Sequence, residues 1–144
     1  MGGDLKLDLM GQSKTKCLRK RDAYMNIQPD GAEDAQIVII GEAPSKDDII
    51  SGVPFSGSQG ELLFDDILAR AGIFRKDCLV LHTYTKQAPG NKLDIVSDPF
   101  ERSTEHWKLI QKHPRKLIIA VGEYALRFLC NESGITKWRG SLLY

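Results

Sequence analysis

The residues best suited to chemistry in this sequence stand in GEAPSKDDIISGVPFSG, residues 41–57, directly after the apolar run QIVII. Glu42 follows that run, and a carboxylate at the carboxyl end of a strand can position water or accept hydrogen bonds from a ligand. Phe55, between Pro54 and Gly57, can offer an aromatic face to a planar base, a contact worth about 1–3 kcal/mol per base. Each residue also has a plainer interpretation, as a carboxylate that caps local backbone and as a loop aromatic folded onto the core.

The other features of this stretch are less specific. Asp47 and Asp48 are paired acids, and paired acids in a turn are usually only solvated. The stretch contains neither GxGxxG nor a P-loop, so it does not match the common phosphate-binding loops of nucleotide-binding proteins. This stretch alone therefore does not distinguish a ligand site from a connecting loop, and the rest of the sequence is needed.

Three short apolar runs predict the strands that would position these residues. They lie at 36–42, 78–84 and 116–122, and each is bounded by turn residues, which is typical of parallel strands covered on both faces. Alternation of such strands with helices predicts an α/β fold of three layers, αβα, around a small, mostly parallel sheet. Ligands bind beyond the carboxyl ends of the strands in such sheets. The segments 41–57 and 83–92 both leave strands at that edge, so we expect the site there.

Helices are predicted between and after the strands. The first begins at Ser58, with Glu61 completing a capping box. Its expected apolar stripe consists of Leu63, Ile67 and Ala71, with Phe64 and Leu68 beside them. The second begins at Asp98-Pro99, carries Phe100, Trp107 and Ile110, and ends before Pro114. The third is EYALRFLC, directly after the last strand.

Composition narrows the class of protein. The chain has 144 residues with 42% hydrophobic and 27% charged residues, as in a soluble globular domain. No apolar run approaches the roughly 20 residues of a membrane span, and the N-terminus lacks the layout of a secretory signal, so we expect a cytoplasmic protein. The three cysteines form no C-x-x-C pair. Residues 1–35 are expected to form a basic helical region or arm, and 36–144 one α/β domain that folds as a unit.

A net charge of +1 gives no global field that favours nucleic acid, but basic residues are concentrated near the N-terminus. This basic cluster comprises Lys14, Lys16, Arg19, Lys20 and Arg21. Such a cluster is either a solvated arm or a patch that contacts phosphates.

Taken together, the motifs resemble those of the uracil-DNA glycosylase superfamily, in the branch of thermophiles and many bacteria. GEAPSKDDIISGVPFSG is similar to its first active-site motif, G-E-x-P-G, an acid-rich turn and G-x-P-F-x-G. SQGELLFDDILARAGI, TKQAPGNK, HPRKLIIAVGEYALRFL and ITKWRG resemble four further segments of the family in the same order. The resemblance extends over about residues 14–140.

The resemblance implies a DNA-repair hydrolase that cleaves the N-glycosidic bond of a base flipped out of DNA. Phe55 would stack on the base, Gly41, Glu42 and Ala43 would line the pocket, and Glu42 would orient the water. Asp48 stands where the family often has a pocket acid. Thr83 stands where the family has an asparagine that reads the uracil edge. The residues implied in DNA binding are Lys86, Asn91 and the basic cluster.

Three departures from the family accompany these matches. One hydroxyl at Thr83 cannot supply both the donor and the acceptor of an amide, so uracil specificity does not follow. The related branch holds an iron–sulfur cluster on four cysteines, but only Cys17 matches here. The other three places fall on Lys14, Gln87 and about Thr104, so we expect no cluster and no other metal or cofactor.

The third departure concerns the C-terminal motif, a His-Pro-Ser that lies downstream of the I-T-x-x-R-G segment in the family. His82, His106 and His113 do not replace it by sequence position. We therefore expect an incomplete domain whose C-terminal strand is missing, either a monomer or part of a longer chain, with little or no activity of its own. An alternative is a catalytically impaired DNA-binding module of a replication or repair protein, such as a phage-type DNA polymerase. A third interpretation is an unrelated doubly wound enzyme for a small metabolite.

Overall fold

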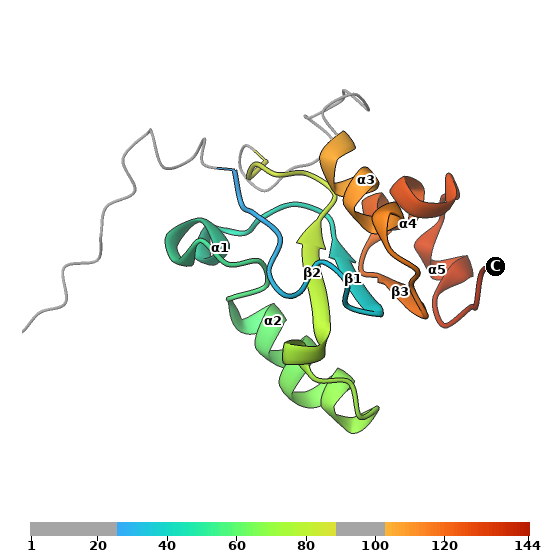
Figure 1. Cartoon of the computed structure of the whole chain (residues 1–144), viewed down its shortest axis with the longest axis horizontal. Coiled ribbons are helices and arrows are strands. Elements are labelled where there is room, and N and C mark those ends of the chain that lie inside the picture. The colour runs from blue at the N-terminus through green and yellow to red at the C-terminus, as the bar shows by residue number, and fades with distance from the viewer. Residues whose placement is uncertain (1–25, 89–102) are drawn as a thin grey trace, which may run out of the picture.

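The sheet at the centre of the molecule has three parallel strands in the order β2-β1-β3 (Figure 1). The structure is a computed structural model, and it describes residues 26–88 and 103–144. The strands are β1 (Ile37–Gly41), β2 (Cys78–His82) and β3 (Leu117–Ala120). Gly41 pairs with His82, and Ile40 with Ala120, so the three strands end together at one edge. The predicted parallel sheet with its first strand in the interior is confirmed.

Seven helical segments connect and follow the strands in the described part of the chain. They are α1 (Lys46–Ser51), α2 (Ser58–Glu61), the π-helical stretch η2 (Leu62–Leu68), the 3₁₀ turn η3 (Arg75–Asp77), α3 (Thr104–Lys112), α4 (Glu123–Cys130) and α5 (Ile135–Trp138). None of the described helices has the length and apolar character needed to cross a membrane.

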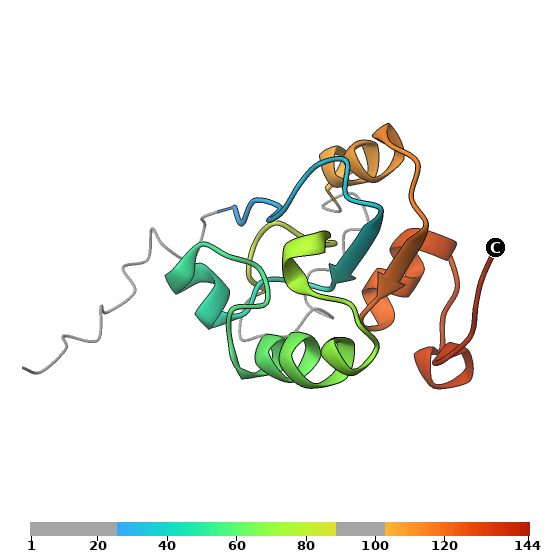
Figure 2. The same cartoon turned by 60° about the horizontal axis from the view of Figure 1, so that its bottom comes forward.

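Alternate residues of β1 face opposite sides of the sheet, and each side is covered by helices (Figure 2). Val38 and Ile40 pack with Ile110 of α3 and Ala125 of α4. Ile39 packs on the other side, in a cluster that η2 supplies with Phe64 and Leu68. A strand buried on both faces explains the continuous apolar run in the sequence. The predicted αβα layering is therefore confirmed.

The helix after Phe55 differs in two details from its prediction. Gly57, not Ser58, precedes the first helical residue, and no side chain caps this end. Phe64 and Leu68 are buried, whereas Ile67 is 53% exposed. Gly60 also faces inward, and a Cβ there would lie 1.8 Å from the Phe55 carbonyl oxygen. Gly60, Phe64 and Leu68 therefore share the inward face, in place of the predicted Leu63, Ile67 and Ala71.

The second predicted helix agrees with the structure at its C-terminal part, and the third agrees over its full length. The predicted start at Asp98-Pro99, together with Phe100, lies outside the described residues. The described helix α3 begins at Thr104, where the Ser103 hydroxyl accepts a hydrogen bond from the backbone N–H of His106, and it ends before Pro114. Helix α4 covers the predicted EYALRFLC without change.

The described part of the N-terminal region packs against β2. Asp30 and Val80 exchange two backbone hydrogen bonds, and the Ile27 side chain is only 3% exposed. The basic cluster at residues 14–21 lies outside the described residues, as does Asn91.

Candidate functional site

A cavity of about 500 Å³ opens beyond the carboxyl ends of β1 and β2. Five of the residues predicted for the site line it, namely Gly41, Glu42, Ala43, Asp48 and Phe55. His82, the last residue of β2, and Ala88, which follows that strand, also line this cavity. The two loops that were expected at one edge of the sheet therefore meet there, within residues 43–57 and 83–88.

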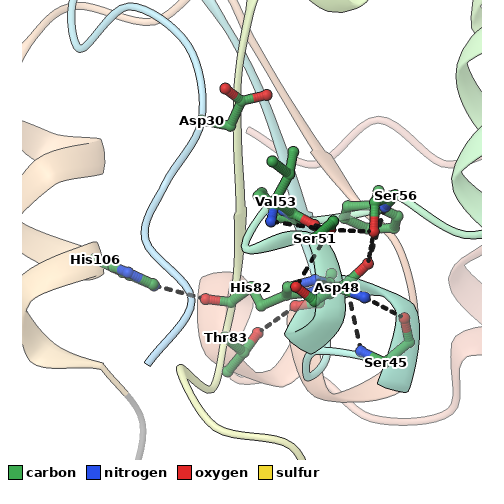
Figure 3. Close-up of polar contacts among 12 residues, drawn as sticks. Asp30, Ser45, Asp48, Ser51, Val53, Ser56, His82, Thr83 and His106 are labelled. Atoms are coloured by element: carbon green, nitrogen blue, oxygen red, sulfur yellow. Dashed lines mark hydrogen bonds and ion pairs between the residues drawn. The ribbon is translucent and has the colours of Figure 1, made fainter. Parts of the chain in front are cut away.

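Asp48 lies at the centre of a hydrogen-bond network at one side of the cavity (Figure 3). It closes a capping box at the start of α1: its carboxylate accepts from the Ser45 backbone N–H at 3.1 Å, and its own N–H donates to the Ser45 hydroxyl at 3.2 Å. The other carboxylate oxygen accepts from the Ser56 backbone N–H at 2.9 Å. His82 Nε2 lies 2.9 Å from Asp48 Oδ2. Asp48 therefore ties α1, the loop after Phe55 and the end of β2 together.

Burial and hydrogen bonding act on Asp48 in opposite directions. Its side chain is 2% exposed, so the expectation that the paired acids are only solvated is wrong for Asp48, while Asp47 is exposed. Burial by itself would raise the pKa of the Asp48 carboxyl. The hydrogen bonds from His82 and from two backbone N–H groups outweigh burial and hold that pKa well below its usual range. Asp48 is thus a fixed negative charge beside the cavity.

The backbone at Phe55 has an unusual conformation that neighbouring groups hold in place. Its φ is 56°, in the left-handed region, which costs of order 1–3 kcal/mol for a residue with a side chain. The Arg75 guanidinium donates to the carbonyl oxygen of Pro54 at 2.6 Å and to that of Phe55 at 3.4 Å. Asp30 pairs with the same guanidinium at 2.8 Å. Arg75 thereby fixes the turn that presents the Phe55 ring to the cavity.

The Phe55 ring lies against two other rings and the backbone of β1. It stacks on His82, with ring centroids 4.7 Å apart and planes 23° from parallel, and it meets Phe64 edge-on at 6.1 Å. A Cβ at Gly41 would lie 2.5 Å from Phe55 Cζ and 2.7 Å from His82 Nδ1. Only glycine at position 41 leaves space for both rings at the end of β1.

Glu42 caps the backbone of α4 and lines the cavity. Its Oε1 accepts a hydrogen bond from the Tyr124 backbone N–H at 3.2 Å, in the first turn of α4. Gly122, with φ 105°, makes this approach possible, because a Cβ there would lie 2.4 Å from Glu42 Cδ. The carboxylate therefore caps backbone, as the plainer interpretation predicted, and it also lines the cavity.

Thr83 and Lys86 stand apart from the predicted residues that line the cavity. Thr83 is fully buried, and its hydroxyl donates to the Gly41 carbonyl oxygen at 2.9 Å (Figure 3). It holds the end of β1 against β2, and its side chain is not part of the cavity lining. Lys86 is exposed. The residue that the sequence interpretation missed is His82, one position earlier, which lies in the lining and contacts both Asp48 and Phe55.

Two of the places where the family has cluster cysteines fall on described residues, and neither residue fits an iron–sulfur cluster. Gln87 and Thr104 offer a carboxamide and a hydroxyl where a cubane cluster needs thiolates. Lys14 and Cys17 lie outside the described residues. Among the residues that the structure describes, no group of three or more His, Cys, Asp and Glu side chains could hold a metal ion.

Comparison with known proteins defines the class of protein to which this fold and cavity belong. Residues 28–143 match the Uracil DNA glycosylase superfamily. The chain therefore belongs to the uracil-DNA glycosylase superfamily.

Particular members of that family are similar to this chain over most of its length. A type-4 uracil-DNA glycosylase of Archaeoglobus fulgidus is 30% identical over 102 residues, which are 70% of this chain and 50% of the relative. The type-4 enzyme of Thermotoga maritima is 30% identical over 78% of this chain and 59% of its own. That of Saccharolobus solfataricus is 28% identical over 85% and 58%, respectively. The matched part of the chain thus spans only half to three-fifths of these relatives.

Proposed function

We propose that this chain is a glycosylase-like domain that takes a base flipped out of DNA into the cavity beside Phe55 and hydrolyses its N-glycosidic bond. The observation that carries the proposal is the cavity itself, which combines an aromatic ring, a carboxylate and a side-chain-free strand end at Gly41. A planar base would stack on such a ring, since stacking on an aromatic ring is favourable for every base. The type-4 uracil-DNA glycosylases to which the chain is similar support the same function.

Each residue of the site would have a distinct part in the reaction. Phe55 would stack on the flipped base, and the absence of a side chain at Gly41 leaves room for the Phe55 ring. Glu42 would orient a water molecule toward the sugar carbon. In the hydrolysis, the water oxygen bonds to C1′ as the bond from C1′ to the base nitrogen breaks, and that electron pair leaves with the base. The proton from the water passes to the carboxylate or to solvent.

The alternative, a DNA-binding module with impaired catalysis, draws support from Thr83. Its hydroxyl hydrogen is already donated to the Gly41 carbonyl, and the side chain lies outside the cavity lining. A site without an amide to read the base edge loses discrimination, because such reading rests on paired donors and acceptors. We therefore expect slow release of uracil by this chain and relaxed selection of the base.

The test is a pair of assays on wild type, Phe55→Ala and Glu42→Gln. Binding to single-stranded oligonucleotides with and without one uracil is measured at several salt concentrations, and release of uracil is measured on the first. Phe55→Ala should weaken binding of the uracil oligonucleotide roughly 5- to 150-fold. Glu42→Gln should leave binding nearly unchanged and abolish the remaining release of uracil. Binding that ignores Phe55→Ala would contradict the proposal and favour the small-metabolite enzyme.

The salt series tests the proposed contact between DNA phosphates and the basic cluster. Affinity should fall as salt rises, with a slope set by the number of phosphates neutralised. Glutamine replacements of Lys14, Lys16, Arg19, Lys20 and Arg21 should reduce that slope by a similar amount with either oligonucleotide, because phosphate contacts carry no base information. Identical slopes before and after the replacements would exclude the cluster from DNA binding.

We also propose that the domain folds without an iron–sulfur cluster. The carboxamide of Gln87 and the hydroxyl of Thr104 support this, since neither replaces a thiolate. Protein purified anaerobically should be colourless, with iron and sulfide far below one cluster per chain. A brown protein with stoichiometric iron and sulfide would contradict this proposal without affecting the proposed base site.

A further inference from the structure

The ring of Phe55 rests on a second ring that the family motifs do not mention. His82 stacks on Phe55 with a centroid separation of 4.7 Å, and its residue is 5% exposed. A ring held nearly parallel to Phe55 restricts the tilt of Phe55, because offset-stacked aromatic pairs have a defined geometry. A base that stacks on Phe55 would need that tilt to be fixed.

His82 is itself fixed from two sides. Its Nε2 donates to the Asp48 carboxylate at 2.9 Å, and its backbone carbonyl lies 2.7 Å from His106 Nδ1. A carboxylate is only an acceptor, so the bond assigns the proton to Nε2. The rotation of the His82 ring is therefore set by Asp48, and its position by β2 and α3.

Asp48 also holds the chain next to Phe55. While Oδ2 accepts from His82, Oδ1 accepts from the Ser56 backbone N–H at 2.9 Å and from the Ser56 hydroxyl at 3.1 Å. One carboxylate thus sets both the ring that supports Phe55 and the backbone that follows it. Both residues of the Phe55–His82 stack are therefore held by Asp48, His82 directly and Phe55 through the backbone of Ser56.

The second ring nitrogen of His82, Nδ1, forms no hydrogen bond within the described part of the chain, and burying it in this way is unfavourable. Nδ1 is buried and, among the described residues, it is the one buried side-chain nitrogen or oxygen without a hydrogen-bond partner. Such atoms are rare in folded proteins and mark positions where another demand prevails. His82 supplies both a flat ring that stacks on Phe55 and an N–H group that donates to the buried Asp48. An apolar aromatic residue at this position would supply only the ring.

We propose that His82 is a positioning residue whose ring, anchored by Asp48, supports Phe55 so that Phe55 can stack on a bound base. The role rests on the proposed function, because it acts on the base only through Phe55. It predicts that His82 contributes to recognition of the base and not to binding of the DNA backbone.

A matched pair of substitutions separates the ring from the hydrogen bond. His82→Leu and His82→Phe both remove the N–H donor to Asp48, but only His82→Phe keeps a flat ring against Phe55. Binding is measured to two single-stranded oligonucleotides of one sequence, one with a central 2′-fluorinated deoxyuridine, which resists hydrolysis, and one with a tetrahydrofuran abasic site. The ratio of the two dissociation constants is the base preference.

We expect His82→Leu to lower the base preference roughly 2- to 10-fold, the range of an aromatic pair. His82→Phe should keep at least half of the wild-type preference, and affinity for the abasic oligonucleotide should be equal in all three proteins. In a double-mutant cycle, Phe55→Leu with His82→Leu should lose no more preference than Phe55→Leu alone, because His82 acts through Phe55.

Several outcomes would overturn this role. They are an unchanged preference in His82→Leu, an equal loss in His82→Phe, or losses that multiply in the double variant. If the wild type itself shows no base preference, the proposed function fails and this role fails with it. A wild-type preference that His82→Leu leaves intact refutes the role of His82 alone.

A measurement on the wild type covers the case in which His82→Leu does not fold. The Cε1–H resonance of His82 in a proton–carbon NMR spectrum reports the stack, because the ring current of Phe55 shifts it. It should move when the 2′-fluorinated deoxyuridine oligonucleotide is added and stay in place with the abasic one. A resonance that responds equally to both would contradict a role in base recognition.

Discussion

Two buried histidines, His82 and His106, lie in contact and have different surroundings. Each is 5% exposed, and the carbonyl of His82 lies 2.7 Å from His106 Nδ1. The His82 ring pairs with the Asp48 carboxylate and stacks on Phe55 in the cavity lining. The His106 ring pairs with a neutral carbonyl and joins α3 to β2. Burial alone therefore does not identify a functional histidine; its partner and the surface that its ring contacts do.

The partner of His82 provides the strongest test of that difference. Asp48→Ala removes the acceptor for His82, for the Ser45 N–H and for the Ser56 N–H. Removing a buried carboxylate that accepts several hydrogen bonds should cost about 3–5 kcal/mol, because each hydrogen bond to a charged group contributes about 1.5–3 kcal/mol. We expect urea unfolding to show a loss of that size in the free energy of unfolding. The neighbouring Asp47→Ala is the control, since an exposed carboxylate should change stability by no more than about 0.5 kcal/mol. Similar losses in both variants would mean that the Asp48 network contributes little.

The second test replaces His106 and asks whether this histidine affects stability without affecting base preference. His106→Ala removes one hydrogen bond to the His82 carbonyl and some packing of α3, at an expected cost of about 1–3 kcal/mol in the free energy of unfolding. The preference for a base over an abasic site should stay at the wild-type value. A loss of base preference as large as that of His82→Leu would show that His106 holds the site as much as Asp48 does.

The sheet could be predicted from the sequence, whereas the polar contacts of the site could not. The three strands form continuous apolar runs because helices cover both faces, and that pattern is visible residue by residue. Helix α1 was missed, although Ser45 and Asp48 have the spacing of a capping box, because the Gly- and Pro-rich stretch around it indicated a loop.

The contact between His82 and Asp48 joins residues 34 positions apart. It depends on the pairing of β1 with β2 and on the packing of α1, and neither leaves a local pattern. His82 also ends an apolar strand, where a histidine is as compatible with simple burial as with a site. Thr83 was chosen by its alignment with the family, and the structure turns its hydroxyl to the backbone of Gly41 instead.

The smallest expected effect is the dependence of stability on pH, which distinguishes His106 from the His82–Asp48 pair. Burial lowers the pKa of His106 below its ordinary value of 6.5, and this outweighs the hydrogen bond to the His82 carbonyl. The unfolded chain then binds a proton at His106 more readily than the folded chain does. Stability from neutral His106 is therefore complete above about pH 6.5 and is lost as pH falls toward the lowered pKa.

Asp48 responds in a separate pH range. Its pKa is lowered from 3.8, so its contribution is complete above about pH 4 and is lost only as pH falls further. We expect wild-type stability to decline first as pH falls below about 6.5, by about 1.4 kcal/mol for each unit by which the pKa is lowered. A second decline should follow below pH 4. His106→Gln should remove the first decline alone, and Asp48→Asn should reduce the second alone. Urea midpoints measured from pH 3 to 8 check this, and a first decline that persists in His106→Gln would contradict its assignment to His106.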